Sequence, residues 1–206
     1  MIVAFLRHGS TEWNEQGRMQ GRRDVPLSAA GRKEVEAWRT GMSDASLISR
    51  SAQWYSSPLR RAVETAEILS GASPQHEPAL IEMDWGDWEG RTLDELRVAH
   101  GAAFAQNEDR GLDFRPPNGE SPRDVHERLR PWLRRVANGP GAVIAVTHLG
   151  VLRVILAAAT GWDMTGKPPV RLNSDALHRF AIESTGRVTI DECNLPLAPA
   201  VARITP

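Results

Sequence analysis

Five stretches of the chain carry the apolar patterns typical of β-strands. Residues 2–6 and 142–146 are apolar throughout, as strands buried on both faces of a sheet are. Residues 53–57 end at Pro58, and two stretches near the C-terminus form an antiparallel pair joined at Thr185 and Gly186. The predicted strands are residues 2–6, 53–57, 142–146, 176–182 and 187–194.

Between these strands, apolar residues recur at the three- and four-residue spacing of amphipathic helices. Ser28 is a candidate N-cap for one helix, whose apolar positions are Val35, Trp38 and Met42. The other predicted helices are residues 59–69, about 92–99, 122–137 and 149–159. Strands that alternate with helices, followed by a final hairpin, predict a three-layer α/β/α sandwich whose sheet is mostly parallel with an antiparallel edge.

Residues 74–122 are the least regular part of the sequence. They contain the acidic, tryptophan-rich stretch 82–90 and the loop 114–120. We expect residues 1–206 to form a single domain, from which residues 74–122 depart as an irregular, cap-like excursion.

The composition gives no reason to expect nucleic acid or a membrane surface as a partner. With 25 basic and 26 acidic side chains, the net charge is −1, so any anion site must be a local cluster. The single cysteine, Cys193, cannot form an intramolecular disulfide. The apolar run at residues 2–6 is too short for a signal peptide or a membrane span. We expect a soluble, cytoplasmic protein.

Two histidines follow the two buried strands in the same local context. His8 follows the first strand and His148 the second, and each has a glycine close behind it, Gly9 or Gly150. Because the carboxyl ends of parallel strands form the ligand crevice of an open α/β sheet, the two imidazoles can meet there. A glycine at such a place lets the backbone approach a ligand closely. A lone histidine at a strand end is more often an ordinary loop residue, but the repeated context favours a shared site.

Basic residues near these histidines suit an anionic ligand. Arg7 adjoins His8, and Arg61 starts a predicted helix, where free N–H groups also favour anions. One guanidinium group can bind a phosphate through two parallel hydrogen bonds. Two arginines and two histidines would therefore form a pocket for a dianion. From spacing alone, Arg60 and Arg61 fit an exposed basic pair better.

Glu82 is a candidate proton donor. It precedes Trp85 and Trp88, which can remove its carboxyl partly from water, and burial raises the pKa of a carboxyl. A raised pKa suits a general acid that works near neutral pH. The alternative is an ordinary glutamate in an acidic surface loop.

Residue types that bind metals are present, but their spacing does not suit a metal site. His8, His148, Asp24, Glu82 and Asp84 are of these types, yet no His-x-x-x-His, His-Glu-x-x-His or clustered-Asp pattern occurs. The adjacent arginines would also repel a cation. We expect a site without a metal or other cofactor.

Five blocks of the sequence resemble, in order, the histidine phosphatase superfamily, which includes the cofactor-dependent phosphoglycerate mutases. The first block begins with Leu6-Arg7-His8-Gly9-Ser10-Thr11-Glu12-Trp13-Asn14. It continues through residues 17–31. The others are residues 57–66, 82–90, 118–121 and 146–151. The resemblance spans residues 2 to about 182 and implies a phosphoglycerate mutase-like fold.

The resemblance implies a role for each matching residue. His8 would accept the phosphoryl group as a phosphohistidine. The oxygens of the phosphoryl group would be held by Arg7, Arg61 and His148. Glu82 would protonate the leaving alcohol and then activate the water that hydrolyses the intermediate. The positions expected to bind substrate are Asn14, Gln20, Gly21 and Gly150.

The resemblance includes enzymes that transfer the phosphoryl group to water and enzymes that transfer it to a second alcohol. The mutases carry a longer insertion between the positions of Glu82 and Gly119, and the short segment here would leave the site more open to water. We therefore expect a phosphomonoester hydrolase. The alternatives are a mutase of small phosphorylated acids and a non-catalytic phosphate-binding module.

Within the family, this short form resembles the broad-specificity phosphatases and the α-ribazole phosphatases. The expected partner is therefore a small-molecule phosphomonoester substrate. Trp13, Trp85, Trp88 and the loop 114–118 could line an aromatic pocket, although core packing is the commoner role of such residues. The C-terminal strands could pair two chains in a homodimer.

Overall fold

The expected α/β architecture is present in the computed structural model, which describes residues 1–43 and 52–197. The side chain of Met42 and the chain beyond residue 197 lie outside this description. Six strands form one sheet in the order β3-β2-β4-β1-β5-β6. They are β1 (Ile2–Arg7), β2 (Gln53–Ser56), β3 (Gln75–His76), β4 (Val143–Thr147), β5 (Ala176–Ile182) and β6 (Val188–Pro196).

The direction of the strands matches the sequence-based expectation. β1, β2, β3 and β4 pair in parallel, β5 pairs antiparallel to β1, and β6 pairs antiparallel to β5. The mostly parallel sheet with an antiparallel edge is therefore confirmed. The two-residue β3 was not expected, because so short a strand shows no alternation in sequence.

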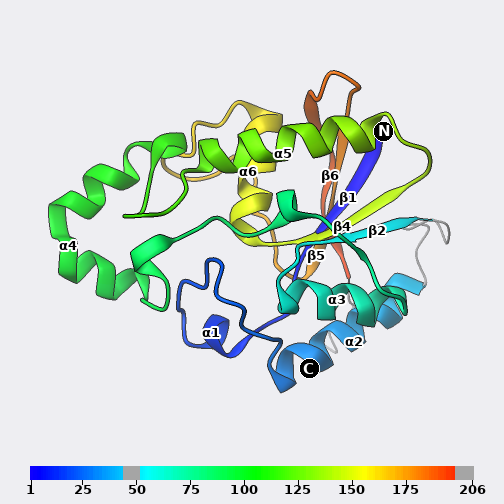
Figure 1. The fold of residues 1–206 in the computed structure, drawn as a ribbon, viewed down its shortest axis with the longest axis horizontal. Coiled ribbons are helices and arrows are strands. Elements are labelled where there is room, and N and C mark those ends of the chain that lie inside the picture. The colour runs from blue at the N-terminus through cyan, green and yellow to red at the C-terminus, as the bar shows by residue number, and fades with distance from the viewer. Residues whose placement is uncertain (44–51, 198–206) are drawn as a thin grey trace, which may run out of the picture.

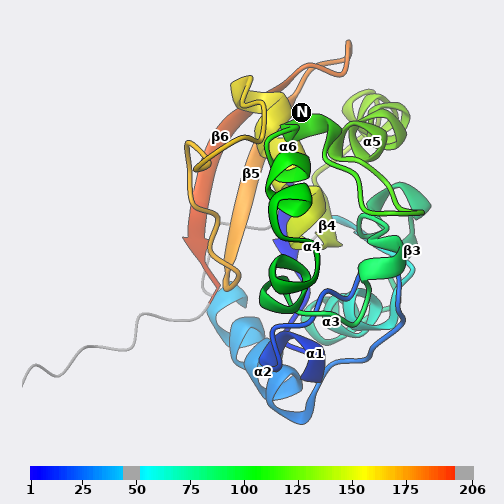
Figure 2. The same cartoon turned by 90° about the vertical axis from the view of Figure 1, so that its left-hand side faces the viewer.

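Helices cover both faces of the sheet (Figures 1 and 2). They are α1 (Glu12–Glu15), α2 (Ala29–Ser43), α3 (Arg60–Ser70), α4 (Leu93–Glu108), α5 (Pro122–Ala137) and α6 (Leu149–Thr160). In Figure 1, α2 and α3 lie on one side of the strands, and α5 and α6 lie on the other. The three-layer sandwich is confirmed. In the described residues, none of these helices combines the length and the apolar character needed to cross a bilayer.

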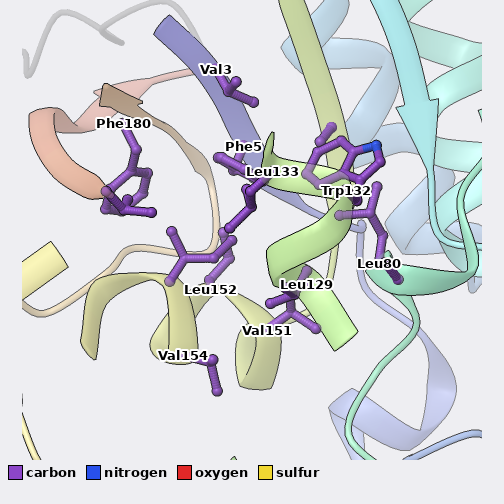
Figure 3. Packing of buried hydrophobic residues seen from close by; sticks show 14 of the residues in the cluster. Val3, Phe5, Leu80, Leu129, Trp132, Leu133, Val151, Leu152, Val154 and Phe180 are labelled. Atoms are coloured by element: carbon purple, nitrogen blue, oxygen red, sulfur yellow. The ribbon is translucent and has the colours of Figure 1, made fainter. Parts of the chain in front are cut away.

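The two faces of β1 pack against different helix layers, as alternation along a strand requires. Val3 and Phe5 belong to the core that includes α5 and α6, whereas Ala4 and Leu6 belong to the core that includes α2 and α3. Figure 3 shows the first of these cores, in which the Phe5 and Trp132 rings meet edge to face, 6.0 Å apart. This packing on both faces holds the end of β1, and with it the site, in place.

Between β3 and α5 the chain leaves the sheet and forms an excursion with a small core of its own, made by Trp88, Leu96 and Phe104. In Figure 1, α4 lies away from the sheet. The helix expected near residues 92–99 is longer, because α4 continues past a kink at Gly101, where φ is 50° and ψ is −126°. The division into one domain with a cap-like excursion stays a prediction.

Candidate active site

The carboxyl ends of β1, β4 and β2 lie side by side at one edge of the sheet. His8 follows β1, and its backbone N–H donates to Thr147 O at the end of β4 over 3.0 Å. His148 comes next after β4. The centroids of the two buried imidazole rings are 5.0 Å apart. The sheet therefore brings together two side chains that are far apart in sequence.

The His8 ring is held in one protonation state. Its Nδ1 lies 2.7 Å from Gly9 O, and a carbonyl oxygen only accepts, so Nδ1 carries the proton. Burial lowers the pKa of His8 well below its ordinary value, and the charges of Arg7 and Arg61 lower it further. The ring is therefore neutral, and its Nε2 keeps a free lone pair. Such a nitrogen can act as a nucleophile.

His148 is fixed by Ser57, a residue that directly follows β2. Its Nε2 lies 2.8 Å from Ser57 Oγ, which also accepts from the N–H of Leu59 over 3.3 Å. The Ser57 hydroxyl can therefore donate to Nε2, which places the remaining proton of a neutral ring on Nδ1. Within the described chain, this buried Nδ1 has no hydrogen-bond partner, so it is free to donate to a bound anion. Our sequence-based site omitted Ser57, although its position after a third parallel strand was a signal.

Two arginines place positive charge beside the histidines. Arg61 is fully buried, and its guanidinium donates to Gly21 O over 2.8 Å and to Arg23 O over 2.7 Å. Burial lowers the pKa of Arg61 to about 10, so it keeps its charge at neutral pH. Arg7 donates to Ser174 Oγ over 2.8 Å. The buried Nε atoms of both arginines lack partners among the described residues, as expected of a site that binds an anion.

Arg60, the neighbour of Arg61, lies at the surface instead. Its side chain forms an ion pair with Glu64 on the same helix, at 3.5 Å. Because Arg61 and not Arg60 points inward from the first turn of α3, the buried charge comes from a single residue of the pair.

Glu82 lies close to these cations, and its carboxylate is held by two backbone groups. Oε1 accepts from Met83 N over 2.8 Å, and Oε2 accepts from Gly150 N over 3.3 Å. Burial raises the pKa of Glu82, although these hydrogen bonds and the charges of Arg61 and Arg7 oppose the change. A side chain at Gly150 would place Cβ 2.4 Å from Glu82 Oε1, so only glycine allows this approach.

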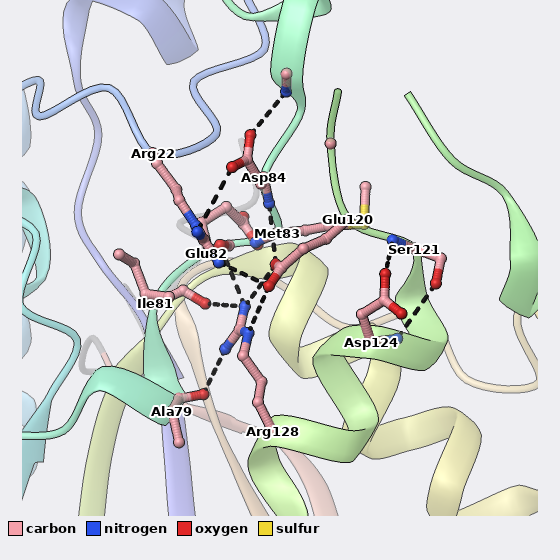
Figure 4. A network of polar contacts seen from close by, with 12 residues as sticks. Arg22, Ala79, Ile81, Glu82, Met83, Asp84, Glu120, Ser121, Asp124 and Arg128 are labelled. Carbon is pink, nitrogen blue, oxygen red and sulfur yellow. Dashed lines mark hydrogen bonds and ion pairs between the residues drawn. The ribbon is translucent and has the colours of Figure 1, made fainter. Parts of the chain in front are cut away.

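A polar network holds the backbone around Glu82 (Figure 4). Arg128, on α5, donates over 2.6 Å to both Ala79 O and Ile81 O, and over 3.2 Å to Glu82 O. Glu120 accepts from Arg128 and from Asp84 N. Sequence reasoning missed this network, because no local pattern shows which carbonyls a distant arginine will bind.

The predicted substrate-binding residues near the N-terminus are held by hydrogen bonds and close packing. Asn14 and Thr11 form a capping box at α1, and Thr11 Oγ1 also donates to Gln20 Oε1 over 2.9 Å. Gly21 uses its carbonyl to bind Arg61, and a Cβ at Gly21 would lie 1.9 Å from Glu89 Oε1. The structure therefore shows what positions these residues, while their contact with phosphate stays a prediction.

The arrangement combines a neutral imidazole with a free ring nitrogen, three side chains able to donate to an anion, and a buried carboxyl with a raised pKa. These groups suit phosphoryl transfer, in which positioning and charge stabilisation dominate. In the ranges 1–43 and 52–197, no three His, Cys, Asp or Glu side chains are grouped as ligands for a metal ion.

Comparison with known proteins identifies relatives of two activities. The model of the histidine phosphatase superfamily (branch 1) matches residues 3–194. A glucosyl-3-phosphoglycerate phosphatase of Mycolicibacterium vanbaalenii is 32% identical over 179 residues, which cover 81% of this chain and 77% of that protein. A 2,3-bisphosphoglycerate-dependent phosphoglycerate mutase of Methylobacterium radiotolerans is 33% identical over 195 residues, which cover 84% of this chain and 91% of that protein.

A solved structure has the same fold over nearly its whole length. The mycobacterial glucosyl-3-phosphoglycerate phosphatase in complex with VO3 aligns with a TM-score of 0.79 and 28% sequence identity. The alignment covers 94% of this chain and 98% of that chain.

Proposed function

This chain belongs to the histidine phosphatase superfamily, and we propose that it hydrolyses phosphomonoesters of small molecules with His8 as the covalent nucleophile. The observation that carries the proposal is the hydrogen bond from His8 Nδ1 to Gly9 O. It leaves Nε2 unprotonated at a place where Arg7 and Arg61 can hold the phosphoryl oxygens.

In the first step, His8 Nε2 attacks phosphorus and the bond from phosphorus to the alcohol oxygen breaks. Arg7, Arg61 and His148 stabilise the charge on the transferring group. Protonated Glu82 gives its proton to the leaving oxygen. The products are the free alcohol, a phosphohistidine and a Glu82 carboxylate.

In the second step, water attacks the phosphohistidine. The Glu82 carboxylate takes a proton from this water, and the bond between phosphorus and Nε2 breaks. Inorganic phosphate leaves, His8 returns to its neutral state, and Glu82 is protonated again. One carboxyl therefore acts as acid and then as base.

Transfer to water is preferred over transfer to a second alcohol because the chain between Glu82 and Gly119 is short. A short segment limits how far the site can be closed to water. Coverage of the relatives does not separate the two activities, because the chain covers 98% of the phosphatase structure and 91% of the mutase. The mutase among the relatives makes phosphoglycerate isomerisation the second candidate. A cytoplasmic location and a homodimer stay predictions.

The test is a phosphate-release assay in EDTA with α-ribazole phosphate, sugar phosphates, nucleotides and 3-phosphoglycerate. We expect turnover by the wild type and an acid-labile phosphoenzyme, both of which are lost in His8→Ala. The matched control, His76→Ala, changes an exposed histidine on the edge strand β3 and should keep both.

Three results would contradict the proposal in different ways. Unchanged turnover in His8→Ala would exclude His8 as the nucleophile. With a trace of bisphosphate primer, isomerisation of 3-phosphoglycerate faster than phosphate release would identify a mutase. Binding of vanadate without turnover of any ester would identify a non-catalytic phosphate-binding module.

A further inference from the structure

A cavity of about 380 Å³ lies next to the two residues whose N–H groups hold the Glu82 carboxyl. Met83 and Gly150, whose N–H groups bind this carboxyl, both line it. The volume lies in the range of roughly 300–1,000 Å³ that is usual for small-molecule sites. Because the leaving alcohol must meet Glu82 to receive its proton, this cavity is where the alcohol part of a substrate would lie.

The walls of the cavity are mainly apolar and come from two parts of the chain. The excursion contributes Trp85, Phe104 and Phe114, and the Trp85 and Phe114 rings meet edge to face at 5.6 Å. The second part, α6 and the segment after it, contributes Val154 and Met164. The walls therefore suit an alcohol with an apolar or aromatic body. Trp88, by contrast, is buried among the rings of the excursion.

Arg153 interrupts these apolar walls. It lies one turn after Gly150 on α6, and its guanidinium lies over the Trp162 ring, 5.3 Å from the centroid. Its Nε is buried without a hydrogen-bond partner in the described part of the chain. Burial alone lowers the pKa of Arg153, with no carboxylate opposing the change.

The acidic side chains of the cavity do not neutralise this arginine. Glu108 and Asp109 both line the cavity, and both are exposed to solvent. Glu108 is paired with Arg97 at 3.4 Å. A half-buried guanidinium with no acid in the described chain within ion-pairing distance is costly unless a ligand supplies the anion.

We propose that Arg153 is a specificity residue for the leaving group, and that the preferred substrates are phosphomonoesters of alcohols with an apolar or aromatic body and a second anionic group. The inference rests on the proposed function, because it assigns the cavity to the alcohol of that reaction. The anionic group is a carboxylate or a second phosphate, both of which fit the two-pronged donor of a guanidinium.

The test compares substrates that differ only in this group: phenyl phosphate, 3- and 4-carboxyphenyl phosphate, benzene-1,3-diyl bisphosphate and 3-(aminomethyl)phenyl phosphate. We expect the wild type to prefer the better carboxylate or the bisphosphate over phenyl phosphate by roughly 10- to 100-fold in kcat/KM, as charge-assisted hydrogen bonds allow. The cationic ester should be the poorest. Whether a carboxylate or a phosphate gives the larger gain identifies the anion.

The variant Arg153→Met should abolish this preference, mainly by raising KM, while kcat/KM for phenyl phosphate changes by less than about threefold. Arg153→Lys should restore part of it, because the charge stays and the paired donors are lost. The control Arg130→Met removes an exposed arginine of α5 and should change nothing.

The outcomes separate this inference from the proposed function. Hydrolysis of phenyl phosphate without any preference for the anionic esters would overturn the inference and leave the proposed function intact. An equal loss for all esters in Arg153→Met would show that Arg153 has only a structural role. Absence of hydrolysis of every ester would contradict the proposed function itself. If Arg153→Met does not fold, Arg153→Lys decides the question, because a preference for the anionic esters that stays at the wild-type level would overturn the assignment to the paired donors of Arg153.

Discussion

Gly150→Ala should disable the acid while leaving the fold intact. Gly150 is the second residue of α6, and its N–H, one of the free donors of the helix start, binds Glu82 Oε2. The added Cβ would lie 2.4 Å from Glu82 Oε1, so the carboxyl must retreat by roughly 1 Å. Alanine is itself favoured over glycine in a helix by up to about 1 kcal/mol, so the helix has no intrinsic reason to unfold.

The expected size of the effect follows from the role of the displaced group. General acid catalysis contributes about 10²- to 10⁴-fold, and a misplacement of about 1 Å can cost about 100-fold. For an alkyl phosphate, whose alkoxide leaves poorly, we expect kcat/KM to fall by about 100-fold in Gly150→Ala. For 4-nitrophenyl phosphate, whose anion leaves without a proton, the fall should stay below about tenfold.

The assay measures kcat/KM for both esters, because this constant reports the formation of the phosphohistidine. In the proposed mechanism, hydrolysis of that intermediate uses the Glu82 carboxylate as its base, so Gly150→Ala should also show a burst of nitrophenol before slow turnover. Gly139→Ala is the control, since a Cβ there would meet its nearest neighbour at 3.4 Å. Wild-type kcat/KM on the alkyl ester, or equal losses on both esters, would refute the assignment of Glu82 as a positioned acid.

The remaining predictions concern pH and stability. Burial raises the pKa of Glu82 above its ordinary value of 4.5. In the proposed mechanism, the first step needs the protonated form of this carboxyl. With alkyl phosphates, kcat/KM should therefore fall as pH rises through this raised pKa. Glu82→Gln should lack this fall at alkaline pH. If the fall is unchanged in Glu82→Gln, it belongs to another group. The lowered pKa of His8 should keep this imidazole neutral at pH values below its ordinary pKa of 6.5. The acidic limb of kcat/KM, on which His8 becomes protonated, should therefore lie below pH 6.5. Arg128→Lys loses the paired donors to Ala79 O and Ile81 O and should lower the free energy of unfolding by about 3 kcal/mol in urea titrations. A wild-type unfolding midpoint would show that these bonds are replaced by water.

The features that the sequence predicted are those encoded by local periodicity. The apolar runs that became β1 and β4 placed His8 and His148 at neighbouring strand ends, and parallel pairing then brought the rings together. The helix starting after Ser28 was also predictable, because serine is a preferred N-cap residue. In the structure, the Ser28 hydroxyl accepts from Gly31 N.

Features that depend on few residues or on distant contacts were not predictable. α1 is four residues long and rests on the capping box of Thr11 and Asn14, so it has no apolar stripe to detect. The continuation of α4 past Gly101 was missed because glycine disfavours a helix interior and is common where helices end. The bond between Ser57 and His148 joins residues that are far apart in sequence, and only the order of strands in the sheet makes it possible.

Glu82 differs from the histidines in that no strand holds it. Its segment enters the site at the start of the excursion, and the residues that fix its backbone, Glu120 and Arg128, come from the end of the excursion and from α5. The network that places the acid therefore also closes the excursion at its base. A change in chain length between these two ends can alter what covers the site without moving Glu82. This separation gives a physical reason why relatives of similar sequence include both phosphatases and mutases.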